Sequence, residues 1–113
     1  MRTTAEVFRD HRAAIGAGGF DAILVNYAAA ATLIYPGRVA QGHGEIRTLF
    51  EQVFAELDGF DIQENSVTID GPVLLFEWSG PGPDGRMVRG VDTFQIQVDK
   101  IQRQTLSYAI STD

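Results

Sequence analysis

The chain has 113 residues, which is enough for one domain with its own hydrophobic core, and we expect a single domain over residues 1–113. Its net charge of −6 argues against a nucleic-acid partner, because phosphates call for a basic patch. With no cysteine, no apolar signal core at its start and no apolar run long enough to cross a bilayer, the sequence predicts a soluble, cytoplasmic protein without a membrane partner.

Helical spacing dominates the first half of the chain, with two short strands between the helices. Thr3 and Glu6 can form a capping box at the start of the first helix, and the glycine-rich segment 16–19 ends it. An amphipathic stripe near the middle of the chain predicts a long third helix. The elements expected in this half are a helix ending near Ile15, a helix over 20–27, strands over 31–35 and 39–42, and a helix over 45–57.

Alternating patterns dominate the second half and predict four strands, over 60–70, 73–79, 87–98 and 101–110. The apolar phase changes within the first of these strands, which indicates a β-bulge or a strong bend. Helices followed by antiparallel strands predict an α+β fold, with the helices on one face of a bent sheet. Because the other face also needs cover, we expect a homodimer through the outer face of the sheet.

One carboxyl interrupts an apolar strand face. The period of two places Asp92 on the same face as Val88, Phe94 and Ile96. A carboxyl among buried apolar groups must find a partner, become neutral or line a cavity. His11 lies on the apolar stripe of the first helix, where a core histidine that only binds a neighbour is the plainer interpretation.

The facing of the last strand depends on the turn before it, since a shift of one residue reverses every side chain. A two-residue turn would place Arg103, Thr105 and Ser107 beside Asp92. A three-residue turn or a bulge would place Gln104, Leu106 and Tyr108 there. The more apolar character of the second set favours it. On the strand over 73–79, we expect Trp78 to face inward and Glu77 outward.

Four segments carry a family resemblance through their order and spacing: Ala13–Ile23, Ala31–Gly37, Gly42–Phe50 and Val91–Ile101. Together they resemble the nuclear transport factor 2-like superfamily, in its SnoaL-like and ketosteroid isomerase-like branch. The resemblance implies a cone-shaped, cystatin-like roll, with three N-terminal helices on a strongly curved, mainly antiparallel sheet. It also implies an apolar pocket and a homodimer. Activities vary widely on this fold, so the fold alone does not define the chemistry.

The ketosteroid isomerase pattern can be carried over at four positions. Asp92 falls where that enzyme has its protonated oxyanion-hole aspartate, a well-known example of a carboxylic acid kept neutral by an apolar site. His11 falls where it has the oxyanion-hole tyrosine, and Phe50 replaces a supporting tyrosine. Tyr35 occupies the position of the general base. The resemblance therefore does not imply the steroid isomerase mechanism for this chain.

These observations predict a small-molecule protein with an apolar pocket, in which His11 and Asp92 carry acid–base catalysis of the isomerase, cyclase, hydrolase or dehydratase type. In this hypothesis Asp92 accepts a hydrogen bond from His11 and sets the tautomer of its imidazole. The substrate class is a mostly apolar carbonyl or cyclic compound. No cofactor is expected, and two histidines without ligand spacing do not predict a metal site. The alternative is a non-catalytic ligand-binding module or a dimeric scaffold. The candidates for the pocket lining are Tyr35, Phe50, Phe54, Phe76, Trp78, Leu106 and Tyr108.

Overall fold

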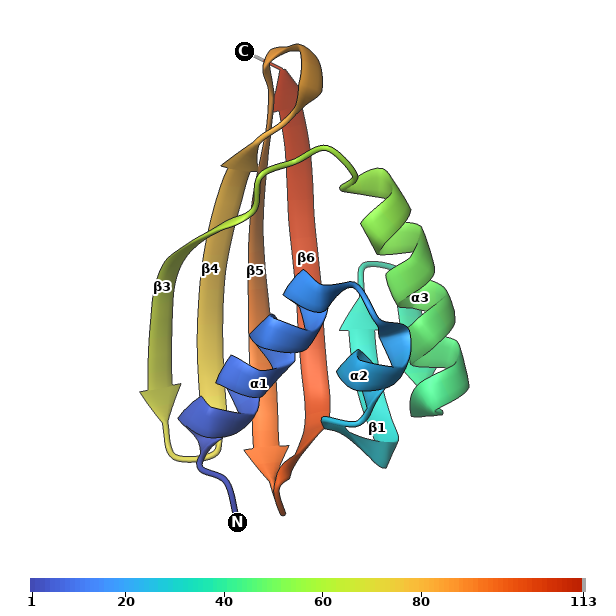
Figure 1. Cartoon of the computed structure of the whole chain (residues 1–113), viewed down its shortest axis with the longest axis vertical. Helices are drawn as coiled ribbons and strands as arrows, with labels where there is room; N and C mark the ends of the chain where they lie inside the picture. The colour runs from blue at the N-terminus through green and yellow to red at the C-terminus, as the bar shows by residue number, and fades with distance from the viewer. Residues whose placement is uncertain (113) are drawn as a thin grey trace.

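Helices pack on one face of a curved, six-stranded sheet in the computed structural model, which describes residues 1–112 (Figure 1). The helices are α1 (Thr4–Ala17), α2 (Phe20–Leu24) and α3 (Gly42–Glu56). The strands are β1 (Tyr27–Tyr35), β2 (Arg38–Gln41), β3 (Gln63–Asp70), β4 (Val73–Pro81), β5 (Arg86–Gln97) and β6 (Lys100–Thr112), with a 3-10 turn at Pro83–Gly85. The α+β class predicted from the sequence is confirmed.

The strand order is β2-β1-β6-β5-β4-β3. Every neighbouring pair is antiparallel except β1 and β6, which run parallel. Figure 1 shows α1 crossing the face of the sheet formed by β4, β5 and β6, with α3 standing beside β1. Between residues 1 and 112, no helix has the length and hydropathy that a membrane crossing requires.

Local signals place both ends of α1. The Thr3 side chain accepts a hydrogen bond from the Glu6 amide, and the Glu6 carboxylate accepts one from the Thr3 amide, so the predicted capping box is present. Gly18 ends the helix in the left-handed region at φ 79°. The amphipathic stripe on this helix then turns His11 and its apolar neighbours toward the sheet.

The prediction of a helix over 20–27 is wrong beyond Leu24. The Asn26 carbonyl accepts a hydrogen bond from the Ile101 amide at 2.8 Å, and Tyr27 pairs with Ile101. Pairing with β6 therefore draws Tyr27 into β1, against its local helical spacing. The third helix begins at Gly42, three residues before the predicted start, and His43 lies inside it with Nε2 2.9 Å from the Tyr27 carbonyl oxygen.

Two irregularities set the facing of the later strands. In β3 the register shifts between Glu64 and Ser66, where the sequence predicted a bulge. Between β5 and β6 the turn has two residues, Val98 and Asp99, both at positive φ. A second register shift follows it and leaves Gln102 without a partner on β5.

The bulge in β6 has a direct consequence for the interior of the sheet. It places Leu106, rather than Thr105, opposite Asp92. Gln104 and Leu106 are accordingly buried, which agrees with the second of the two predicted facings. On β4, Trp78 is buried and Glu77 is exposed, as expected from the alternation.

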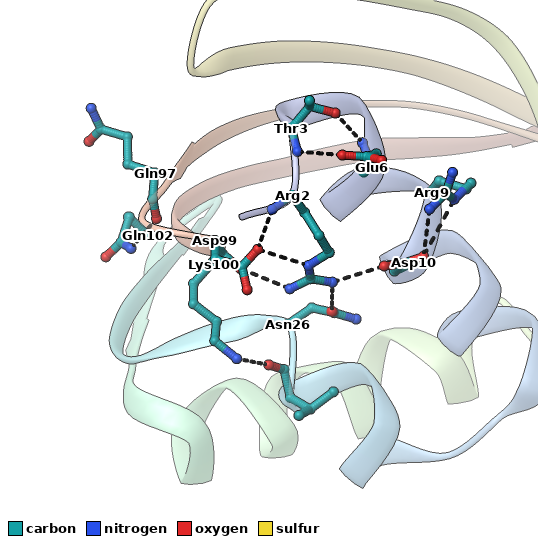
Figure 2. Close-up of polar contacts among 11 residues, drawn as sticks. Arg2, Thr3, Glu6, Arg9, Asp10, Asn26, Gln97, Asp99, Lys100 and Gln102 are labelled. Atoms are coloured by element: carbon teal, nitrogen blue, oxygen red, sulfur yellow. Dashed lines mark hydrogen bonds and ion pairs between the residues drawn. The ribbon is translucent and has the colours of Figure 1, made fainter.

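Arg2 ties the start of the chain to the β5–β6 turn (Figure 2). Its Nε donates to the Asp99 carboxylate at 3.1 Å, and Nη2 donates to the Asp99 carbonyl at 2.8 Å. Nη1 donates to Asp10 at 3.0 Å and to Asn26 at 2.8 Å. All three guanidinium nitrogens are thus occupied by protein acceptors.

Candidate functional site

A cavity of about 640 Å³ lies between α1, α3 and the inner face of the sheet. The segment that follows α3 also contributes to its wall. Most of the lining is aliphatic or aromatic, as is usual for small-molecule sites. The lining residues are Phe8, His11, Arg12, Ile15, Gly16, Phe50, Val53, Phe54, Leu57, Asp58, Gly59, Phe60, Ile62, Phe76, Trp78, Asp92, Phe94, Gln104 and Leu106.

Asp92 lies on the cavity wall with only 6% of its surface exposed. The Trp78 indole Nε1 donates a hydrogen bond to Oδ1 at 2.8 Å, and the Gln104 amide Nε2 donates to Oδ2 at 2.8 Å. An indole N–H and an amide NH₂ can only donate. Both carboxylate oxygens therefore have partners that suit the ionised form.

A third residue fixes the direction of the Gln104 amide. The Tyr27 hydroxyl donates to Gln104 Oε1, so the amide nitrogen is the atom left to face Asp92. Tyr27 is itself 2% exposed, and burial raises the pKa of its hydroxyl, which therefore keeps its proton. The chain of donors runs in one direction, from Tyr27 through Gln104 to Asp92.

A glycine makes room for the other donor. Trp78 pairs with Gly90 on β5, and a Cβ atom at Gly90 would lie 2.1 Å from the Trp78 ring. No real side chain tolerates that approach, so the indole can lie against β5 only because this residue has no side chain. In that position its Nε1 reaches Asp92, two residues further along the strand.

The environment of Asp92 acts on its pKa in two directions. Burial raises the pKa from 3.8 to about 6, while the hydrogen bonds from Trp78 and Gln104, followed by the positive charge of Arg12, act to lower it. Burial is the largest of these effects. The side chain therefore changes its protonation state near neutral pH, in the range where a carboxyl both accepts and releases protons readily.

His11 reaches the same cavity from α1 and is 2% exposed. Its ring packs against the rings of Tyr27 and Phe94, with centroids 5.6 and 5.4 Å away. Burial, followed by the nearby charge of Arg12, lowers the pKa of its imidazole from 6.5 to about 3. The ring is therefore neutral at neutral pH.

The expected His11–Asp92 hydrogen bond does not form within residues 1–112. His11 Nδ1 is buried without a hydrogen-bond partner, and the partners of Asp92 are Trp78 and Gln104. The register of β4, β5 and β6 instead brings Trp78 and Gln104 to the two carboxylate oxygens, one donor to each. His11 and Asp92 both line the cavity but do not contact each other through a hydrogen bond, so Asp92 does not set the tautomer of the imidazole.

The structure divides the predicted pocket-lining residues between two places. Phe50, Phe54, Phe76, Trp78 and Leu106 line the main cavity. Tyr35 and Tyr108 instead line a separate, smaller hollow of about 150 Å³ beside α3. They stand apart because the Tyr108 hydroxyl donates to the Glu56 carboxylate at the end of α3, and the Tyr35 ring packs against Tyr108.

Sequence reasoning missed Tyr27 and Arg12 as residues of this region. The helical spacing before Tyr27 hid its place at the start of β1. Arg12 follows His11 on α1, and helical spacing alone gave no reason for two adjacent residues to reach one cavity. Gln104 was expected beside Asp92 only as a member of one of two alternative facings. The feature that could have found it is its position two residues before Leu106, on the apolar face of β6.

The chemistry of the lining suits proton transfer and hydrogen bonding. No three histidine, aspartate or glutamate side chains gather into a metal-binding group in the part of the chain that the structure describes. The polar groups that face the cavity include one titrating carboxyl, one neutral imidazole, one amide and one guanidinium.

A six-stranded curved sheet with helices and a cavity on one face defines the nuclear transport factor 2-like class of folds. The SnoaL-like domain matches residues 8–104, and the chain belongs to that family. The sequence has no significant match among curated proteins.

Solved structures agree with the fold. A protein of this fold of unknown function from Burkholderia xenovorans has a TM-score of 0.76 at 21% identity, with 97% of this chain and 84% of that chain covered. A Sinorhizobium meliloti protein, provisionally named a polyketide cyclase, has a TM-score of 0.76 at 20% identity, covering 88% and 92%. A Kribbella flavida protein, provisionally named a ketosteroid isomerase, has a TM-score of 0.78 at 15% identity, covering 97% and 80%.

Proposed function

We propose that the protein catalyses proton transfer on a mostly apolar carbonyl or cyclic compound held in the main cavity, with Asp92 as the proton carrier. The observation that carries this proposal is the setting of Asp92. It is a carboxyl in an apolar cavity, held by two donor-only groups, with a pKa of about 6. When the pKa lies near the working pH, a large fraction of the carboxyl groups is ionised and ready to accept a proton. The protonated form is then still acidic enough to return that proton.

The proposed step is the removal of a proton from a carbon next to a carbonyl group. The Asp92 carboxylate takes the proton, and the electron pair of the broken C–H bond moves toward the carbonyl oxygen, which gains negative charge. Asp92 then returns the proton to another atom of the same molecule. This is consistent with an isomerase or cyclase, in line with the names of two relatives of the same fold.

In this proposal His11 acts as a neutral hydrogen-bond donor toward the developing oxyanion. The residue lines the cavity, and its pKa of about 3 keeps the ring neutral. A neutral imidazole can donate one hydrogen bond without competing with Asp92 for the proton. The roles thus differ from those of a His–Asp pair, since each group acts on the substrate directly.

Deuterium exchange tests the proposal without knowledge of the natural substrate. A panel of apolar cyclic ketones is incubated with the protein in D₂O, and exchange next to the carbonyl is followed by NMR. We expect protein-dependent exchange that Asp92→Asn loses by about a hundredfold or more. Asp58→Asn, which changes another carboxyl of the cavity wall, is the matched control and retains the activity. Equal exchange in Asp92→Asn and in the parent protein would refute the role of Asp92.

A second candidate function is a dimeric ligand-binding module, and the outer face of the sheet favours it. Val73 and Leu75 on β4 and Val91 on β5 are 44%, 37% and 39% exposed, on the face opposite the cavity. Exposed apolar residues on neighbouring strands of an uncovered sheet face are compatible with an interface. A homodimer through this face is compatible with either a catalytic or a binding role, and light scattering in solution measures its mass.

A further inference from the structure

Arg12 and Arg2 have similar exposure and very different surroundings. Their side chains are 31% and 27% exposed. The guanidinium nitrogens of Arg2 all donate to protein acceptors, as Figure 2 shows. Within residues 1–112, the hydrogen bond of the Arg12 guanidinium is one from Nη1 to Glu64 at 3.5 Å, the outer limit of such a contact.

The position of Arg12 is nevertheless well defined. Its guanidinium carbon lies 4.6 Å from the centre of the Phe76 ring, and both residues line the main cavity. Stacking on an aromatic face holds the planar guanidinium while leaving its edge donors free. Glu64 is half exposed, so its long contact with Arg12 is screened by water and contributes little.

The charges around the cavity make this arginine unusual. Arg12 is the lone lysine or arginine among the described residues that line it, and the protein as a whole has a net charge of −6. The other charged groups of the wall are the carboxyls of Asp58 and Asp92. An apolar ligand alone would have no use for a fixed cation with free donors on this wall.

We infer that the cavity binds a mostly apolar molecule that carries one carboxylate, and that Arg12 recognises this group through the free edge of its guanidinium. This inference rests on the proposed function, because it names the substrate class of the same cavity. A carboxylate matches the planar fork of an arginine and can accept two parallel hydrogen bonds from it. The apolar body of the molecule would then lie against the aromatic wall, toward Asp92 and His11.

Trp78 offers a direct measurement, since it is the single tryptophan of the chain and lines the cavity. Adamantane-1-carboxylate and adamantane-1-carboxamide form a matched pair of probes that do not absorb at the excitation wavelength. We titrate each and follow the Trp78 emission. The carboxylate is expected to bind about tenfold more tightly than the amide, the size typical of a charge-assisted hydrogen bond.

Three variants assign the preference to Arg12. Arg12→Gln is expected to weaken the carboxylate far more than the amide, so that it binds the two probes equally, and Arg12→Lys is expected to keep part of the preference. Arg47→Gln is the control, because Arg47 also lies over an aromatic ring, that of Phe20 at 5.3 Å, but outside the cavity lining. It is expected to keep the full preference. Cooperative urea unfolding, followed by the Trp78 emission, shows that each variant has folded.

Several results would overturn the inference: equal affinity of the parent protein for the two probes, a carboxylate preference that survives in Arg12→Gln, or no response of Trp78 to either probe. These results are separable from a failure of the proposed catalysis. If Asp92-dependent deuterium exchange is present while the probes bind equally, the acid preference alone is wrong. If the preference depends on Arg12 while exchange is absent, the cavity binds acids without the proposed reaction.

Discussion

Asp92 and His11 are buried in the same cavity but respond to burial in opposite ways. The pKa of His11 is about 3 in the folded protein, compared with 6.5 for an unperturbed imidazole. The contribution of this residue to the stability of the fold is therefore fully present above pH 6.5 and is lost as the pH falls toward 3. Asp92 has a folded pKa of about 6 against 3.8, so the folded state holds a proton that the unfolded chain releases. That contribution is lost as the pH rises from about 4 to about 6. The two effects oppose each other in this window.

Replacing one of these two residues allows the effect of the other on the pH dependence of stability to be measured alone. In Asp92→Asn we expect stability to fall on acidification from pH 6 to 4 with a slope near one proton, which is about 1.4 kcal/mol per pH unit. In His11→Phe the slope in the same window has the opposite sign. Urea unfolding followed by Trp78 emission between pH 4 and 7 measures both. A flat profile for Asp92→Asn would contradict the buried, neutral state of His11.

The direction of the Gln104 amide depends on Tyr27. In Tyr27→Phe the amide oxygen loses its donor and can turn toward Asp92, where it accepts a hydrogen bond only from the protonated carboxyl. The variant therefore stabilises the protonated form, and we expect the pKa of Asp92 to rise above about 6. Carbon-13 NMR of the carboxyl group follows the titration. Tyr35→Phe, in the other hollow, should leave the pKa unchanged, and a lower pKa in Tyr27→Phe would refute this role.

At the scale of elements, the β5–β6 turn carries a strained residue. Val98 has φ 52° and is 73% exposed, so a β-branched side chain occupies the left-handed region without contributing to the core. Asparagine tolerates this conformation and is favoured in such two-residue turns. Val98→Asn is expected to stabilise the protein by about 1 kcal/mol, measured by urea unfolding. Val98→Ile, which keeps the β-branch, is the control and should give no gain; an equal gain would show that strain is not the cause.

The pairing of β4 with β5 sets the position of the indole. Because a Cβ at Gly90 would lie 2.1 Å from the Trp78 ring, Gly90→Ala must displace the ring and break its hydrogen bond to Asp92. We expect a loss of about 1–3 kcal/mol and a red shift of the Trp78 emission. Gly44→Ala on α3, where nothing lies within 4 Å of the added atom, is the control. An unshifted emission in Gly90→Ala would contradict this packing.

The sequence allowed most elements to be predicted, because α1, α3 and the inner face of β5 each have a regular apolar period. It also placed Asp92 and His11 on inward faces. The register of β6 could not be derived, because a bulge after a two-residue turn gives the same facing as a three-residue turn. The hydrogen bonds from Trp78 and Gln104 depend on that register and on the space at Gly90, so no local pattern contains them.

At the scale of the whole molecule, the outer face of the sheet is the place where we expect a second copy to bind. Leu75→Lys and Val91→Lys each add a charge to this face without touching the cavity. Either change is expected to shift a dimer toward monomer in light scattering, while the binding of cavity probes persists. Val25→Lys, at an exposed site beside α2, is the control and should leave the mass unchanged. A parent protein that is monomeric at all concentrations would refute the dimer.

The parallel pairing of β1 with β6 has a consequence for the order in which the chain folds. β1 forms near the start of the chain, yet its partner on the inner side of the sheet is the last described strand, as in the pair Leu33 and Gln104. A growing polypeptide on the ribosome therefore exposes the hydrogen-bonding edge of β1 that pairs with β6 until β6 has been made. Contacts between such distant segments slow folding, because the long intervening loop must close first. The nascent chain thus has a long interval in which a chaperone can bind β1 before β6 does.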